Sequence, residues 1–406
     1  MRKEYQLSSI DFDALRCYTE IPPAAEALLD HPEREVSFDL NLKIGPNTIL
    51  QANAYVVYAN TVRGPAKGGI RMAADVTLAE TRDLAERMVW KTALARIPFG
   101  GGKSGIALDP HTLSRFEKTA VLKEWVHMMQ LDLRHGMYVP APDMGTNATD
   151  MAVIFGELHL PECVTGKPPR IGGLPGRLEA TGRGVSFCIQ QTLAEILHLP
   201  VTGSRIAIQG FGNVGSYAAR YLHAAGCRVI AVSDVTGGRY QPEGLDIPTL
   251  AAYVATNGSL EGAPGRVISN EELLLLEVDV LAPCARENQL TEENASVIKA
   301  HAIVEGANGP TTPDADAILL RRHIPLVPDF LANAGGVIAS YVEWRQAKSG
   351  AMTEIQETFS IIENRLALGM QEMLSLSERH HIPLRMACQV AAAKELVASL
   401  RDRDWI

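Results

Sequence analysis

Three lysines of this chain stand in sequence settings that suit the binding of an anion. Lys67 precedes two glycines in GPAKGGIRM, and Lys103 follows three glycines in FGGGKSGI. Lys91 lies on the apolar stripe of a segment with helical periodicity, where a lysine either reaches out to water or holds an anion. Within a chain of net charge −9, these settings suggest a pocket for a small anion with more than one carboxylate. Burial and mutual repulsion lower the pKa of clustered lysines toward neutrality, which suits a general base.

The glycine-rich stretch at residues 99–106 does not fit a nucleotide-phosphate loop. A Walker A motif ending at Lys103 needs glycine at position 97, where the chain has Ile97, and it needs a strand rather than a helix before it. We therefore interpret the small neighbours of Lys103 as room for a substrate to approach. Asp143, in YVPAPDMGT, follows a proline in a rigid segment that could aim its carboxylate.

A second site is indicated by GFGNVG, which supplies Gly210, Gly212 and Gly215 in the spacing G-x-G-x-x-G. The motif follows the strand-like RIAIQ and opens a helix-like segment, which is the context of a dinucleotide-binding turn. Asp234 ends the next strand-like run, where an acid accepts hydrogen bonds from the adenosine ribose. The sequence favours NAD, and NADP stays possible because Arg239 could accommodate a 2′-phosphate.

The elements that must position these residues follow from periodicity. Residues 34–44 and 48–59 alternate around Gly-Pro-Asn and predict a β-hairpin, and residues 77–98 predict a capped helix that Pro98 stops. From residue 184, short β-branched runs alternate with helical segments, which predicts a mostly parallel sheet. After residue 345 the chain is helical again. The fold class is therefore α/β, with two domains.

Bulk composition excludes several classes of protein. The length of 406 residues suits two domains, and 46% hydrophobic with 21% charged residues is typical of globular chains. The negative net charge disfavours nucleic acid and membrane surfaces as partners, and no apolar run is long enough to span a membrane. Without a secretory signal, we expect a cytoplasmic protein. The six cysteines show no CxxC spacing and the histidines no ligand pair, so we expect reduced thiols and no metal.

Taken together, the motifs resemble the amino-acid dehydrogenases of the glutamate dehydrogenase type. The resemblance runs from about residue 35 to the C-terminus and rests on GPAKGGIRM, PFGGGKSGIALDP, VPAPDMGTN, LPGRLEATGRG, IQGFGNVG, VDVLAPCA, EGANGPTTPDAD and PDFLANAGGVIASYVEW. It implies a substrate-binding and oligomerisation domain at residues 1–183, completed by helices at 346–406. It also implies a Rossmann-like domain at 184–345, a catalytic cleft between the two, and a homohexamer.

The resemblance also implies roles for residues of this chain. Lys103 resembles the family's catalytic lysine, which activates the water that attacks an iminium intermediate, and Asp143 matches the acid that carries protons to and from the amine. Lys91 corresponds to the ligand of the substrate α-carboxylate, and Lys67, helped by Ser340, to the ligand of the side-chain carboxylate. The side-chain pocket is expected to be shaped by Ala141, Thr181 and Val337. The cofactor is expected to contact Gly210, Phe211, Gly212, Asn213, Val214, Gly215, Asp234, Thr181, Asn308 and Asn333.

Lys67 favours glutamate as the substrate. Relatives that act on leucine, phenylalanine or valine have an apolar residue at this position, and an unpaired ammonium buried against leucine would cost several kcal/mol. The implied reaction converts glutamate to 2-oxoglutarate and ammonia with hydride transfer to NAD(P). Three alternatives stay open: a leucine- or phenylalanine-type dehydrogenase, a non-catalytic regulatory subunit, and, more distantly, a P-loop NTPase.

Overall fold

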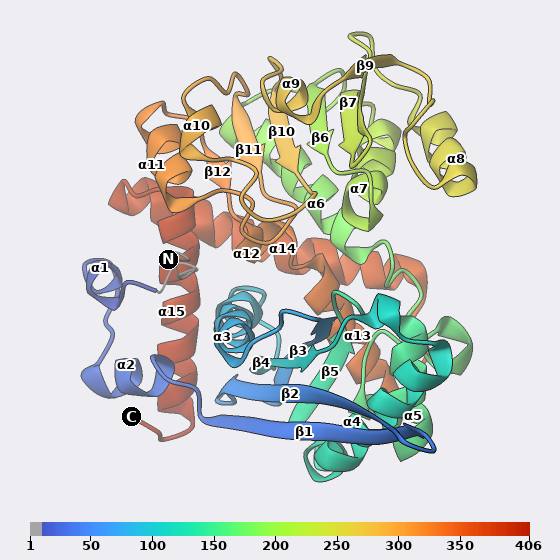
Figure 1. Cartoon of the computed structure of the whole chain (residues 1–406). Helices are drawn as coiled ribbons and strands as arrows, with labels where there is room; N and C mark the ends of the chain where they lie inside the picture. Colours follow the sequence, from blue (N-terminus) through green and yellow to red (C-terminus); the bar gives the residue numbers. More distant parts are fainter. Residues whose placement is uncertain (1–9) are drawn as a thin grey trace. The chain divides into compact units, whose positions relative to one another are not determined.

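The structure, a computed structural model, describes residues 10–406 and contains two sheets, each in its own unit (Figure 1). The N-terminal unit comprises Asp11–Arg177, Val337–Thr358 and Ala392–Ile406. The central unit comprises Leu178–Gly336 and Phe359–Ala391.

These bounds differ from the domains expected from sequence. The chain divides after Arg177 and Gly336 rather than after residues 183 and 345, and the helical stretch Phe359–Ala391 groups with the central unit. The physical reason is visible in side-chain contacts, because Arg183 pairs with Glu363 and Arg385 with Glu305. The first nine residues of the expected first domain lie outside the described residues.

The sheet of the N-terminal unit has the order β1-β2-β4-β3-β5. Its strands are β1 (Arg34–Gly45), β2 (Thr48–Asn60), β3 (Ala66–Ala73), β4 (Gly100–Ala107) and β5 (Tyr138–Pro142). β1 and β2 pair antiparallel around the Gly-Pro-Asn turn, which confirms the predicted hairpin. β4 pairs antiparallel with β2 and parallel with β3, and β3 pairs parallel with β5. Apart from Phe99, the stretch FGGGKSGI thus lies in an inner strand of the sheet.

Helix α3 (Leu78–Leu94) packs directly on β4. The Thr77 side chain accepts a hydrogen bond from the Glu80 N–H, as the capping pattern predicted. A β-carbon on Gly101 would lie 2.4 Å from the Val89 nitrogen, so only glycine lets this helix approach the strand so closely. The buried stripe of α3 accordingly runs through Thr81, Ala85, Val89 and Thr92, whereas Lys91, which was expected on the apolar stripe, is half-buried.

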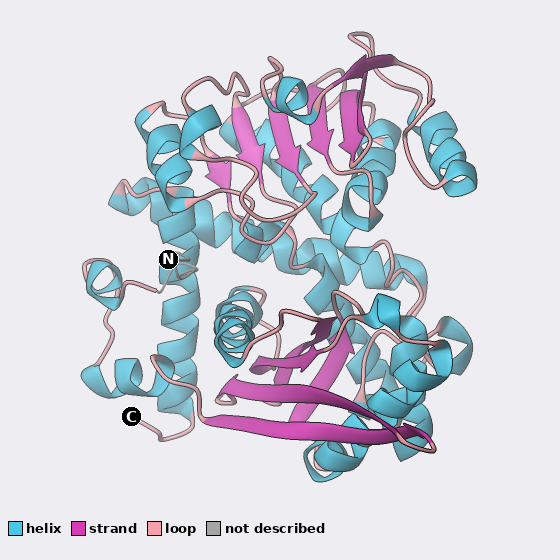
Figure 2. Cartoon of the chain, viewed as in Figure 1, coloured by secondary structure: helices cyan, strands magenta, loops and turns pink. Residues whose placement is uncertain are grey.

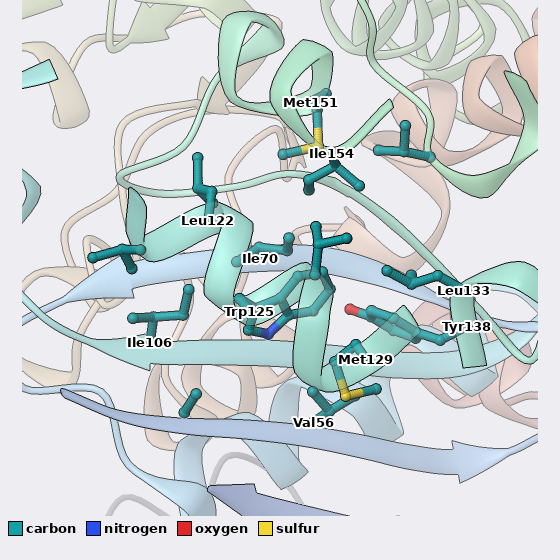
Figure 3. Close-up of a cluster of buried hydrophobic side chains, with 14 of the residues drawn as sticks. Val56, Ile70, Ile106, Leu122, Trp125, Met129, Leu133, Tyr138, Met151 and Ile154 are labelled. Carbon is teal, nitrogen blue, oxygen red and sulfur yellow. The ribbon is translucent and has the colours of Figure 1, made fainter. Parts of the chain in front are cut away.

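The opposite face of this sheet carries the core of the unit. Helices α4 (Arg115–Arg134) and α5 (Ala148–Leu158) contribute Leu122, Trp125, Met129, Leu133, Met151 and Ile154, which meet strand residues such as Ile70 and Tyr138 (Figure 3). The remaining helices of this unit are α1 (Phe12–Arg16), α2 (Pro23–Leu29) and α13 (Gly335–Ser349), which begins in the central unit, with short turns at Pro110–Thr112, Pro161–Cys163 and Pro169–Ile171. One face is therefore filled by apolar side chains, and the face under α3 is left for the charged residues.

The central unit contains the predicted, mostly parallel sheet, in the order β12-β11-β10-β6-β7-β8-β9. Figure 2 shows the strands of both sheets in magenta. The parallel strands are β6 (Arg205–Gln209), β7 (Arg228–Asp234), β10 (Val280–Pro283), β11 (Ala302–Val304) and β12 (Leu326–Val327). β8 (Gly237–Tyr240) and β9 (Arg266–Ile268) extend one edge antiparallel. The helices of this unit are α6 (Ala180–Gln191), continued by a wider turn at Thr192–Ile196, α7 (Asn213–Ala224), α8 (Ile247–Asn257), α9 (Asn270–Leu274), α10 (Glu292–Ala295), α11 (Pro313–Arg321) and α12 (Asp329–Ala332).

Two long helices end the chain, α14 (Ile355–His380) and α15 (Leu384–Asp402), and both belong partly to each unit. The helix α14 confirms the helical segment predicted after residue 345, and it buries an apolar stripe of Phe359, Ile362, Leu366, Met370 and Met373. Pro383 separates α14 from α15, as expected from the absence of an N–H on proline.

Candidate functional site

Lys67 and Lys103 lie on the same face of the N-terminal sheet, under α3. Lys67 pairs with Gly101 across the parallel β3–β4 ladder, and Gly101 and Lys103 are two residues apart on β4. Because side chains alternate along a strand, Lys67 and Lys103 project from the same side. Both are buried, with exposed fractions of 1% and 6%.

Lys103 forms an ion pair with Asp143. Its Nζ donates to Oδ2 of Asp143, which follows β5 directly. The Arg71 guanidinium lies on the other side of this carboxylate, with Nε 3.4 Å from Oδ1, and also donates to Glu80 at 2.5 Å. The Thr146 hydroxyl anchors the segment because it accepts from the Asp143 N–H at 2.9 Å and donates to a backbone carbonyl of β3.

The electrostatics of this pair favour an ionised carboxylate. Burial raises the pKa of Asp143, but the charges of Lys103 and Arg71 and the hydrogen bonds from Lys103 and the Met144 N–H outweigh it and lower the pKa to about 2. Asp143 is therefore a carboxylate at neutral pH, held between two cations.

The glycines around the lysines allow close packing of the neighbouring segments and do not leave an open space. A β-carbon on Gly69 would lie 2.7 Å from both Cβ and Oδ2 of Asp143. A β-carbon on Gly68 would lie 1.7 Å from the Gly102 carbonyl. The expectation that small residues clear a path for substrate is thus replaced by a packing reason, since the space beside both positions is filled by protein atoms.

Lys67 sits among further charged groups. Burial, and then the positive charges of Arg177, Lys103 and Lys167, lower the pKa of Lys67 well below its usual value, and Glu343 opposes them. The lowered lysine pKa expected for this cluster therefore falls on Lys67. Burial likewise lowers the pKa of Arg177, again opposed by Glu343.

Glu343 reaches this cluster from α13 through an ion pair with Lys167, and neither side chain is exposed. Lys167 Nζ donates to Glu343 Oε1 at 2.8 Å and to the Pro161 and Val164 carbonyls. Glu343 also accepts from the Gly166 and Lys167 N–H groups. These bonds satisfy the charges that burial would otherwise make costly.

The other residues expected to bind substrate lie in the same unit. Ala141 pairs with Gly69 across β3–β5, so it lies on the same face of the sheet as Lys103 and Asp143. Ser340 is buried on α13, one turn before Glu343, and Val337 lies one turn earlier again. Lys91 is half-buried in the last turn of α3, the helix that covers this face.

The G-x-G-x-x-G motif has the geometry that a bound dinucleotide requires. Gly210 follows β6 with φ 95°, and α7 begins at Asn213. A β-carbon on Gly215 would lie 1.8 Å from the Gly210 carbonyl, whereas one on Gly212 would meet nothing within 4 Å. The turn is therefore tight where helix and strand meet and open where a pyrophosphate would approach the helix N-terminus. Phe211 is buried, and Val214 is half-buried in the first turn of α7.

Asp234 ends β7 as predicted, but its carboxylate already accepts hydrogen bonds from neighbouring segments of the chain. Oδ1 accepts from the Thr236 N–H at 2.7 Å and from the Thr236 hydroxyl at 2.6 Å, and Oδ2 accepts from the Leu260 N–H at 2.6 Å. Arg239 is buried and donates to the Ala263 and Gly238 carbonyls. Arg239 thus does not present its guanidinium to a 2′-phosphate, contrary to the sequence expectation.

The three residues expected at the nicotinamide end lie beside the fingerprint or at the same sheet edge. Thr181 lies in the first turn of α6, and the neighbouring Gly182 packs on the Val214 carbonyl. Asn213 Nδ2 donates to the Leu178 carbonyl at 3.1 Å, which joins the same two segments. The two asparagines are bonded to each other: Asn333 Nδ2 donates to Asn308 Oδ1 at 2.9 Å.

Sequence reasoning missed Arg71 and Arg177. Arg71 could have been found, because Lys67, Gly69 and Arg71 share one face of β3 by their spacing of two. Arg177 carries no such signal, since it lies outside any strand or helix, and only the tertiary structure brings it to Lys67.

The comparisons with known proteins agree with this geometry. The sequence profile described as Glutamate/Leucine/Phenylalanine/Valine dehydrogenase matches residues 172–403. A second profile, the Glu/Leu/Phe/Val dehydrogenase dimerisation domain, matches residues 32–159. The chain belongs to this family. Its fold is the family's two-domain α/β fold, and it is an oxidoreductase of the amino-acid dehydrogenase type.

Individual members of the family match almost the whole chain. The glutamate dehydrogenase of Thermotoga maritima is 38% identical over 98% of each chain, and glutamate dehydrogenase A2 of Halobacterium salinarum is 42% identical over 93% of this chain and 92% of its own. The cryptic catabolic NAD-specific glutamate dehydrogenase of Bacillus subtilis is 36% identical over 95% of this chain and 92% of its own. The solved hetero-hexameric glutamate dehydrogenase of Thermus thermophilus superposes with a TM-score of 0.90, at 33% identity over 96% of this chain and 94% of that one.

Three further properties bear on the sequence expectations. All six cysteines lie within residues 10–406 and are free thiols, of which Cys17 alone is exposed. Within the same residues, no helix is long and apolar enough to cross a membrane. No group of three or more histidine, cysteine, aspartate or glutamate side chains in that range could hold a metal ion.

Proposed function

We propose that this family member is a glutamate dehydrogenase, which converts L-glutamate to 2-oxoglutarate and ammonia, and the reverse, with NAD(P). The single observation that carries the choice of substrate is the buried side-chain amino group of Lys67, which feels the positive charge of Arg177. An aliphatic amino-acid side chain would leave these two groups with only the negative charge of Glu343, which is already paired with Lys167, whereas the glutamate side-chain carboxylate adds a second one. The relatives named above are glutamate dehydrogenases, and the match covers nearly their whole length.

We assign the binding of the two substrate carboxylates to separate cations. Lys67 and Ser340 bind the side-chain carboxylate, and Arg177 adds a second positive charge there. Lys91 binds the α-carboxylate. Ala141 and Val337 shape the space around the side chain, and the contribution expected of Thr181 stays a prediction. Holding a small dianion at both ends fixes the orientation of its Cα, which is where much of the rate acceleration arises.

Lys103 and Asp143 carry the protons. The carboxylate of Asp143, ionised above pH about 2, can accept a proton from the substrate ammonium and return it to the product amine. Lys103, whose ammonium donates to that carboxylate, orients the water that attacks the iminium carbon. It takes the proton of that water as a neutral amine, after Asp143 has released the substrate proton to solvent and has accepted one from Lys103. The hydrogen bond between Lys103 and Asp143 lets this proton pass directly between them.

The cofactor is NAD, with NADP as a possible substitute, and it accepts the hydride from Cα when bound. Gly210, Gly212 and Gly215 supply the turn that admits its pyrophosphate, and the N–H groups of Asn213 and Val214 face it at the start of α7. Asp234, whose carboxylate also accepts from the Thr236 and Leu260 N–H groups, would accept a hydrogen bond from the adenosine ribose. Thr181, Asn308 and Asn333 hold the nicotinamide end. The burial of Arg239 against backbone carbonyls supports NAD over NADP.

A crossed assay tests the proposal, in which glutamate and leucine are each offered with NAD and with NADP. We expect reduction with glutamate and NAD, loss of that activity in a folded Lys103→Ala variant, and a shift of preference toward leucine in Lys67→Leu. Turnover of leucine above glutamate by the unaltered enzyme would instead favour the leucine-type alternative. Inactivity of the pure chain, restored by a paralogous subunit, would favour the regulatory alternative.

We also propose that the enzyme is a homohexamer. The dimerisation-domain profile covers residues 32–159, and this segment exposes large apolar side chains, among them Ile49, Phe116 and Leu131. Light scattering of the purified chain should give six times its mass of 44.0 kDa. A monomeric mass would contradict the assignment. The cytoplasmic location stays a prediction that cell fractionation would test.

A further inference from the structure

Arg385, near the start of α15, contacts three carboxylates within the central unit. Its Nη2 lies 2.8 Å from Oε1 of Glu305, its Nε lies 3.0 Å from Oδ2 of Asp316, and its Nη1 lies 3.9 Å from Oδ1 of Asp329. Glu305 has no exposed surface and Asp329 is 4% exposed. Buried carboxylates of this kind need a nearby cation, and the planar guanidinium can serve several at once.

The two buried carboxylates hold the backbone of two separate segments. Glu305 Oε2 accepts from the Asp329 N–H at 2.9 Å, which fixes the start of α12. Asp329 Oδ2 accepts from the Gly309 N–H at 2.9 Å, which fixes the segment that follows β11. Both bonds depend on the carboxylates staying in place beside each other, although their charges repel.

Each fixed segment carries one asparagine of the proposed cofactor site. Asn308 directly precedes Gly309, and Asn333 directly follows α12. Asn333 Nδ2 bonds to Asn308 Oδ1 and, at 3.2 Å, to the Ala307 carbonyl. The Ala307 N–H in turn donates to the Pro283 carbonyl at the end of β10. The asparagine pair therefore lies at the carboxyl edge of the parallel sheet, the edge from which the Gly210 turn also emerges and where such sheets bind ligands.

We propose that Arg385 is a positioning residue that fixes the Asn308–Asn333 pair at the nicotinamide end of the bound cofactor. It acts through Glu305 and Asp329. The inference rests on the proposed function, because that function places the two asparagines at the nicotinamide. Without the guanidinium, repulsion between Glu305 and Asp329 releases the Gly309 N–H, and the two segments lose their common anchor.

The experiment compares the binding of NAD with that of ADP-ribose, which has the adenosine and both phosphates but no nicotinamide. Two variants of the full chain are used: Arg385→Lys, which keeps the positive charge but not the planar group that contacts three carboxylates, and Arg385→Met, which removes the cation and leaves Glu305 and Asp329 to repel each other. Kd is measured by calorimetry without substrate, and circular dichroism checks folding. In both variants we expect NAD to bind about tenfold more weakly and ADP-ribose to bind within about twofold of the unaltered enzyme. We expect kcat to fall by about 10- to 100-fold while KM for glutamate stays within about twofold.

Arg401→Met is the matched control, because Arg401 lies on the same helix and forms an exposed ion pair with Glu20. It should leave both Kd values unchanged. A merely structural role of Arg385 would lower the melting temperature and leave the ratio of the NAD and ADP-ribose Kd values as it was, and that unchanged ratio in either folded variant would overturn the inference. Failure of the proposed function is read separately, from the unaltered enzyme, as no binding of NAD and no oxidation of glutamate.

Discussion

Gly69 faces the carboxylate of Asp143 so closely that a β-carbon at position 69 would overlap it, at 2.7 Å from both Cβ and Oδ2. Gly69 lies in β3, which is paired with a strand on each side. Its backbone therefore has little freedom to move away from Asp143. The ion pair of Asp143 with Lys103 thus depends on a residue that has no side chain.

Gly69→Ala should therefore push Asp143 away from Lys103. We predict that kcat falls by about 10- to 100-fold, since a displacement on the order of 1 Å in a reacting group has this effect. Gly156→Ala is the control, because Gly156 lies in α5 and a β-carbon there meets nothing within 4 Å. Steady-state kinetics of both variants, after a check of folding, decide the matter. An unchanged kcat in Gly69→Ala would contradict the role of Asp143 in the reaction.

The binding of glutamate should weaken as pH rises. Burial and the neighbouring cations lower the pKa of Lys67, so its ammonium is lost at a lower pH than that of an exposed lysine. Only the ammonium pairs with the substrate carboxylate, and KM for glutamate should rise up to tenfold for each pH unit above the lowered pKa. Measuring KM between about pH 6 and 10 should show this rise. Lys67→Met should have a high KM that does not depend on pH in this range. A KM of the unaltered enzyme that stays constant with pH would contradict the assignment.

Glu343 should matter for both stability and this pH profile. Glu343→Gln leaves Lys167 buried without a counter-charge, and we predict a loss of about 3–5 kcal/mol in the free energy of unfolding, measured with urea. The same change removes the negative charge that opposes the lowering of the Lys67 pKa, so the rise in KM should begin at a lower pH. Glu357→Gln, which breaks an exposed pair with Arg345, should cost no more than about 0.5 kcal/mol. An equal loss in the free energy of unfolding in the two variants would show that the buried ion pair stabilises the protein no more than the exposed one.

Two glycines of the fingerprint should respond differently to the same substitution. Gly212→Val adds a side chain where no protein atom lies within 4 Å, so the melting temperature should hold while NAD binding weakens by at least about tenfold. Gly215→Val places a β-carbon 1.8 Å from the Gly210 carbonyl and should destabilise the central unit itself. Thermal unfolding and NAD titration of both variants separate the two effects. Unchanged NAD binding in Gly212→Val would place the pyrophosphate elsewhere.

The sequence alone determined those features that repeat along the chain. Alternation around Gly-Pro-Asn predicted the β1–β2 hairpin, and the order of β-branched runs predicted the parallel strands around β6. The glycine spacing at residues 210–215, with a strand before it and a helix after it, predicted the dinucleotide turn. Each of these signals is local, because strand alternation, helix periodicity and turn geometry involve residues that are near one another in the chain.

Only the tertiary structure decided which charges meet. The stretch at residues 99–106 looks like a loop in sequence, and it is the inner strand β4 because α3, β2 and β3 all pack against its glycines. Arg177 and Glu343, each far from Lys67 in the chain, set the electrostatics around that lysine, and Arg239 is turned inward onto backbone carbonyls. The energies of burial and of charge pairs depend on distances in space, and no spacing along a single sequence specifies those distances.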